Sequence, residues 1–242
     1  MRFDLKKIII VGLFAVAMGF FEAIVVVYLR QIYYPEGFSF PLSVLGSKIY
    51  GVELIREFST LVMLVCTGLL AGRTHHEKFG WFLFTFGIWD IIYYAGLKLF
   101  LGWPPSWFTW DILFLIPVTW IGPVLAPVIC SVTMILLALM VIGFSNKGLT
   151  IRFGKLSWIL LLSGALLIFV SFIQDYTTLL IREGFFGGSG GFTKQGLETA
   201  VLSFIPKKFN WWLFGLGEAT ILWAIVRIFL QNSRNRMFAN EK

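Results

Sequence analysis

Hydrophobic residues form six long runs along the chain, separated by shorter stretches in which charged residues gather. The runs cover residues 8–29, 52–72, 79–101, 121–144, 156–181 and 211–230. A helix needs about 20 apolar residues to cross a hydrocarbon core about 30 Å thick, and each run meets that length. The pattern therefore predicts an all-α fold, with residues 1–242 forming a single transmembrane domain of six helices.

The composition supports lipid as the surrounding solvent. Hydrophobic residues make up 58% of the chain and charged residues 14%, against roughly 45–50% and 25% in a soluble domain. Many of the 10 tryptophans stand at the ends of the apolar runs, where aromatic side chains meet the membrane–water interface. The net charge of +7 comes from cations between the runs, so we expect the lipid bilayer, and no nucleic acid, as a partner.

The distribution of positive charge indicates an orientation. If the N-terminus is cytoplasmic, the inner segments carry eleven of the 20 lysines and arginines and the outer loops carry seven. Cytoplasmic loops of membrane proteins are enriched in these residues. We therefore expect both termini in the cytoplasm and the loops 30–51, 102–120 and 182–210 outside. In a bacterial or archaeal cell the membrane would be the plasma or inner membrane.

A further apolar stretch from residue 112 leads into the fourth apolar run. The stretch and the run together are too long to form one straight helix. Residues 112–144 would extend about 50 Å if helical, which exceeds one span at ordinary tilt. Pro117, Pro123 and Pro127 interrupt the stretch and remove backbone donors. We expect a short broken or re-entrant helix from about Trp110, with a break near Gly122. Such a break at membrane depth must be covered by protein or line a cavity.

Acidic residues occur in five of the six apolar runs, and with the expected orientation all of them lie at mid-membrane or in the outer leaflet. Spans one, three, five and six each contain one, and span two contains two near its outer end. An ionised side chain at a helix centre costs about 2.5–3.5 kcal/mol on insertion scales, so these carboxylates should face the bundle interior, be protonated or meet a cation. With Arg56, they form the candidate binding site for substrate or ion: Glu22, Glu53, Arg56, Glu57, Asp90, Asp175 and Glu218.

The cations within the runs are too few to neutralise these acids. Arg56 shares a helix face with Glu53 and Glu57, whereas Arg227 is nine residues after Glu218 and cannot reach it along the helix. An excess of acid suits a bound cation or shared protons. The alternative is a buried ion-pair network that fixes helix register. Asp111 either extends the acidic site or caps the short helix expected beside it.

The sequence predicts no cofactor. The only histidines, His75 and His76, are adjacent in a turn on the expected inner side. This placement disfavours haem ligation across helices and a histidine-rich di-iron site. No catalytic residue or metal ligand can be assigned from the pattern, so the sequence favours a function other than catalysis.

Three functions fit these observations. The first is cation- or proton-coupled transport of a small solute or lipid, using the carboxylates towards the outer leaflet. The second is a non-catalytic structural subunit of a larger membrane complex, whose Trp- and Phe-rich surface packs against other subunits. The third is a carboxylate- and metal-dependent membrane enzyme using an oxygen-preferring ion such as Mg²⁺ or Mn²⁺.

Overall fold

The computed structural model describes residues 5–43, 46–147, 149, 151–182 and 202–240. Six of its helices are long and apolar enough to cross a membrane, as the apolar runs predict. They are α1 (Leu5–Tyr33), α2 (Ser47–Ala71), α3 (His75–Leu101), α4 (Leu125–Ser145), α5 (Lys155–Arg182) and α7 (Trp211–Asn240), and two short strands, β1 (Trp110–Phe114) and β2 (Trp120–Pro123), lie between α3 and α4.

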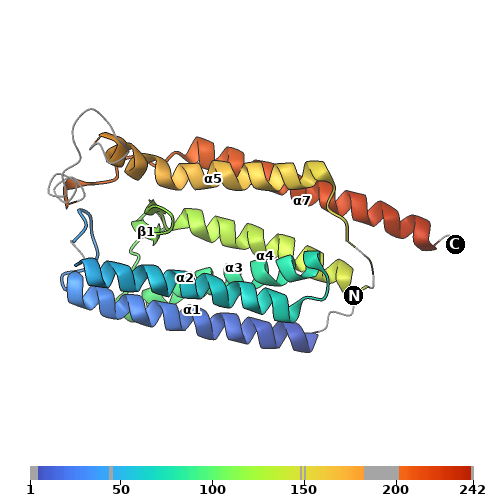
Figure 1. The fold of residues 1–242 in the computed structure, drawn as a ribbon, viewed down its shortest axis with the longest axis horizontal. Coiled ribbons are helices and arrows are strands. Elements are labelled where there is room, and N and C mark those ends of the chain that lie inside the picture. The colour runs from blue at the N-terminus through green and yellow to red at the C-terminus, as the bar shows by residue number, and fades with distance from the viewer. Residues whose placement is uncertain (1–4, 44–45, 148, 150, 183–201, 241–242) are drawn as a thin grey trace.

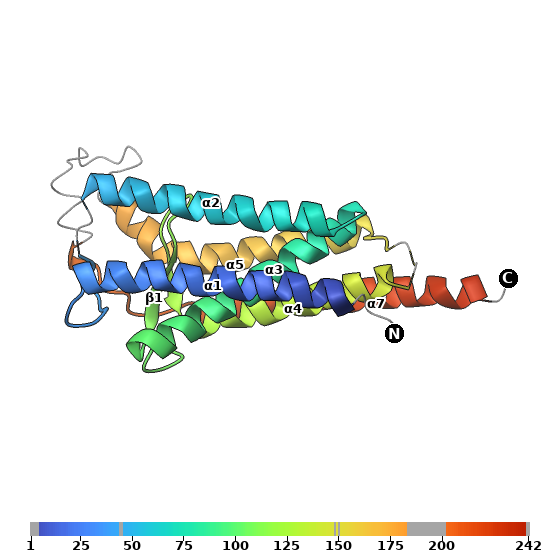
Figure 2. The same cartoon turned by 90° about the horizontal axis from the view of Figure 1, so that it is seen from below.

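The six helices run roughly side by side along one long axis (Figures 1 and 2). The helix α3 packs against α1, α2 and α4, and α5 pairs with α7. Contacts of α7 with α4, and of α5 with β2, join this pair to the other four helices. The first helix begins and the last ends at the same end of the bundle, while the strands lie towards the other end (Figure 1).

Local sequence signals set both ends of the central helix α3. The hydroxyl of Thr74 accepts a hydrogen bond from the Glu77 N–H at 3.2 Å, and the Glu77 carboxylate accepts one from the Arg73 N–H at 2.9 Å. These contacts satisfy donors that a helix start leaves unpaired. At the other end Gly102 has a φ of 65°, a left-handed conformation that glycine adopts at little cost.

The segment between α3 and α4 differs in secondary structure from the sequence prediction. The expected short helix from Trp110 is wrong, because β1 and β2 form an antiparallel hairpin in which Asp111 pairs with Gly122 and Ile112 with Ile121. The strands supply each other's backbone hydrogen bonds, so a helix is not needed to satisfy them. Pro117 lies in the turn between them, and Pro127 lies in the first turn of α4, where its missing N–H costs nothing.

The structure describes nearly all of the loop after α1 but only part of the loop 182–210, both of which are predicted on the outer side. In the loop after α1, the ring of Phe38 packs edge-on against Trp103, with 5.9 Å between ring centroids. This contact holds the loop against the end of α3. The loop 182–210 is predicted on the same side of the membrane, but its residues 183–201 lie beyond the described part of the chain.

Candidate functional site

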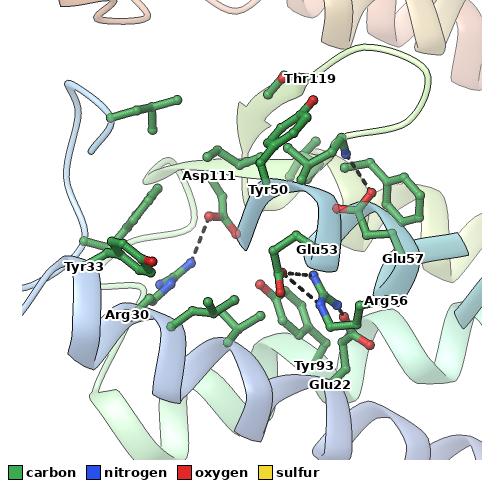
Figure 3. A pocket seen from close by; sticks show the side chains of 18 of the residues that line it. Glu22, Arg30, Tyr33, Tyr50, Glu53, Arg56, Glu57, Tyr93, Asp111 and Thr119 are labelled. Atoms are coloured by element: carbon green, nitrogen blue, oxygen red, sulfur yellow. Dashed lines mark hydrogen bonds and ion pairs between the residues drawn. The ribbon is translucent and has the colours of Figure 1, made fainter. Parts of the chain in front are cut away.

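A cavity of about 530 Å³ lies between α1, α2, α3 and the hairpin, in the size range of small-molecule sites. Side chains from all four elements point into it (Figure 3). Its charged lining residues are Glu22, Arg30, Glu53, Arg56, Glu57, Asp90 and Asp111. Its aromatic lining residues are Tyr33, Tyr34, Phe38, Tyr50, Trp89, Tyr93, Phe114 and Tyr176. The cavity therefore combines an acid excess with aromatic walls.

Arg56 lies between two carboxylates from different helices. Its Nε and Nη2 bond Oε2 of Glu53 at 2.9 and 2.8 Å, and its Nη1 contacts Glu22 on α1. The second oxygen of Glu22 accepts a hydrogen bond from the Thr60 hydroxyl at 3.1 Å. Both carboxylates are buried, so the guanidinium supplies the charge that makes their burial tolerable. The cluster ties α1 to α2 beside the cavity.

A second ion pair joins α1 to the hairpin. Arg30 Nη2 donates to Asp111 Oδ1 at 2.9 Å, and both side chains are buried. The Arg30 guanidinium also lies 3.7 Å from the Trp103 ring centroid and 4.4 Å from that of Phe38, which is favourable cation–π geometry. Burial raises the pKa of Asp111 to about 6, and Arg30 limits that rise. The hairpin is thus fixed to the last turn of α1 by charge.

Two cavity carboxylates form no ion pair within the described part of the chain. Oε2 of Glu57 accepts a hydrogen bond from the Leu115 N–H at 2.9 Å, which holds the hairpin turn against α2. Oδ2 of Asp90 accepts one from the Ser131 hydroxyl at 2.7 Å. Neither bond supplies a positive charge. These two acids therefore keep their capacity to bind a cation or a proton.

The structure brings five of the seven predicted site residues to one cavity and leaves two outside it. Glu22, Glu53, Arg56, Glu57 and Asp90 line the cavity, whereas Asp175 and Glu218 do not.

Asp175 is half-buried on α5, although the next residue, Tyr176, lines the cavity. Glu218 is buried on α7 and accepts a hydrogen bond from the Thr133 hydroxyl of α4 at 2.9 Å. Neither acid is among the residues that line the cavity, so neither contributes its charge to the lining.

The sequence prediction missed Arg30 and left Asp111 open between two roles. Arg30 was counted with the outer loop, because the apolar run ends at residue 29, whereas α1 continues to Tyr33. Asp111 belongs to the acidic site rather than to a helix cap. A usable signal was present for Asp111, since it is a lone charge followed by the apolar residues 112–118.

The donor set does not resemble a metal centre. Among the described residues, no group of three or more His, Cys, Asp or Glu side chains is placed to hold a metal ion. Guanidinium groups stand between the cavity carboxylates instead. His76 lies at the start of α3, at the other end of that helix from Tyr93, and packs against Phe153 with ring centroids 4.7 Å apart.

Comparison with known proteins adds no assignment. No protein-family model, no curated protein and no solved structure matches the chain. The geometry of the cavity is therefore the basis for the function proposed below.

Proposed function

We propose that this chain is an integral membrane protein that binds a positively charged solute in the cavity and transports it in exchange for protons. The six long apolar helices support the membrane location. The cavity supports the choice of a cation, because its carboxylates outnumber its guanidinium groups. In a medium of low dielectric constant, this excess of acid attracts positive charge more strongly than it would in water.

The observation that carries the proposal is the state of Glu57 and Asp90. Each lines the cavity, and each has a hydrogen-bond donor but no ion-pair partner among the described residues. A buried carboxylate without a cation is costly when ionised. A proton can neutralise it in the empty protein, and a bound cation can replace that proton. This exchange links solute binding to proton release.

The aromatic walls favour an organic cation over a metal ion. Tyr50, Trp89 and Tyr93 line the same cavity as the two unpaired acids. The faces of such rings attract ammonium groups within about 6 Å. The volume of about 530 Å³ also exceeds what a bare ion requires. With the predicted orientation, the cavity opens towards the outer leaflet, where an external solute would enter.

The proposal is tested by cation binding to the purified full chain. We expect tetramethylammonium to bind with release of protons, measured by calorimetry in buffers of different ionisation enthalpy, and acetate not to bind. Glu57→Gln keeps an acceptor for the Leu115 N–H but removes the charge, and should weaken binding at least about tenfold.

Glu36→Gln is the matched control, because Glu36 is exposed and does not line the cavity. It should bind tetramethylammonium as the wild type does. Proton-driven uptake of the cation into proteoliposomes, lost in Glu57→Gln and kept in Glu36→Gln, would support transport. Equal binding by wild type and Glu57→Gln would overturn the proposal.

A further inference from the structure

A second hollow, of about 440 Å³, lies beside the cavity, along a neighbouring face of α2. We call it the α2 groove; it lies between Ile55 and Phe58 of α2 and the hairpin turn at Pro117. Tyr50 and Leu115 line both the groove and the cavity. The two hollows therefore lie on either side of these residues, between the start of α2 and the hairpin.

The helix α2 presents different chemistry to the two hollows. Glu53, Arg56 and Glu57 line the cavity, whereas the residues between and beside them, Ile55 and Phe58, line the groove. The groove side chains are largely exposed, Ile55 to 69% and Phe58 to 61%. On a membrane-spanning helix such exposed apolar side chains face lipid. The cavity thus contains the charged side chains of α2, whereas the groove beside it has no charged lining residue and is open towards the acyl chains.

Glu57 lies where the polar and apolar regions meet. Its carboxylate accepts a hydrogen bond from the N–H of Leu115, and Leu115 lines both hollows. A ligand with its charged group at Glu57 would therefore lie next to a residue that also borders the groove. The unpaired carboxylate favours a positive group at that point, and the mainly apolar lining of the groove favours an apolar one.

We propose that the cavity and the α2 groove form one site for an amphiphile with a cationic amine head and an aliphatic chain, which enters sideways from the membrane. This inference rests on the proposed function, because the head group takes the place of the cationic solute in the cavity. The amine lies at Glu57, and the chain passes Tyr50 and Leu115 into the groove. The membrane concentrates such a ligand at the entrance, so no open path from water is needed.

The test uses the purified full chain in phosphatidylcholine nanodiscs and a dodecylamine that carries a photoreactive diazirine near the end of its chain. We expect crosslinks in the peptides that contain Ile55, Phe58 and Pro117, located by mass spectrometry. Unlabelled dodecylamine should prevent the crosslinks, an equal concentration of butylamine should prevent them far less, and dodecyl phosphate should not prevent them. The double variant Ile55→Ala/Phe58→Ala should weaken dodecylamine binding about tenfold and leave butylamine binding unchanged.

Leu70→Ala is the matched control, because Leu70 is 89% exposed near the other end of α2, and it should bind both amines as the wild type does. If butylamine competes as well as dodecylamine and the groove is not labelled, the amphiphile is wrong while the cation-binding proposal stands. If no amine competes, both are wrong. If dodecyl phosphate competes best, the site selects anions and both are again overturned.

Discussion

Arg56 on α2 contacts Glu22 on α1 with one guanidinium nitrogen while the other two bond Glu53, one turn away on its own helix. The two helices pack mainly against α3 and touch each other little. One cation shared by two buried carboxylates therefore provides a specific link between them. The same residues line the cavity, so the geometry of the proposed site and the position of α2 depend on one ion-pair cluster.

Replacing Arg56 by Met should destabilise the protein by about 3–5 kcal/mol, because it leaves Glu22 and Glu53 buried without a cation. Unfolding of the purified chain in mixed detergent micelles measures this change. The triple variant Arg56→Met/Glu22→Gln/Glu53→Gln removes the stranded charges and should recover much of the loss. Equal stability of the single and triple variants would show that the charges are not the cause.

Glu57 should also position the hairpin, independently of any ligand. Glu57→Leu removes the acceptor of the Leu115 N–H and should cost about 1–3 kcal/mol, the penalty for a buried donor without a partner. Glu57→Gln retains an acceptor and should cost less. Hydrogen exchange at the Leu115 amide is the local readout, which should accelerate in Glu57→Leu and change little in Glu57→Gln. Slow exchange in both variants would contradict this role.

The sequence predicts that the charged residues of α2 lie together, because their positions relative to one another depend only on the geometry of a single helix. Glu53, Arg56 and Glu57 are three and four residues apart, and that spacing defines a helix face whatever the surroundings. Depth along each span was also accessible, since it follows from counting residues in an apolar run. Rotation of one helix against another was not accessible. Asp175 and Tyr176 are neighbours on α5, yet only Tyr176 lines the cavity.

The hairpin was missed for a different reason. An apolar stretch of this length favours a helix on average, and the prolines in it indicate only where a helix must stop. The strand around Asp111 is stabilised by pairing with the strand at Gly122, a contact between segments that are apart in sequence. Strand propensity depends on such partners more than helix propensity does. Arg30 was missed because the end of the first helix was placed where the apolar run stops, at residue 29, whereas α1 continues to Tyr33.

The contact between α5 and α7 provides a further prediction. A Cβ added at Gly217 would lie 2.8 Å from the Gly164 carbonyl oxygen and 2.7 Å from Ile168 Cγ1, whereas one at Gly215 meets nothing within 4 Å. Small residues let helix backbones approach this closely in membranes. Gly217→Ala should therefore cost about 1–3 kcal/mol through overpacking, and Gly215→Ala should be neutral. Unfolding curves of the two variants provide the comparison, and equal stability would contradict the close packing.

Asp111 should give the protein a pH-dependent component of stability. Burial raises its pKa from 3.8 to about 6, so between these values the folded protein holds a proton that the unfolded chain has released. Stability from this group therefore decreases as pH rises from about 4 to about 6, by about 3 kcal/mol in all, and stays level above that range. Deprotonation of Asp111 in the folded protein completes the ion pair with Arg30, but stability still decreases with rising pH because the pKa of the folded state remains above that of the unfolded chain.

Infrared spectra of the purified chain test the Asp111 assignment directly. A protonated-carboxyl band should disappear with a midpoint near pH 6, and the part due to Asp111 should be missing in Asp111→Asn. Glu36→Gln, which removes an exposed acid, should retain that part. A spectrum of Asp111→Asn identical to the wild type at about pH 5 would mean that Asp111 is already ionised there. Arg30 would then outweigh burial, and the decrease in stability would fall below that pH.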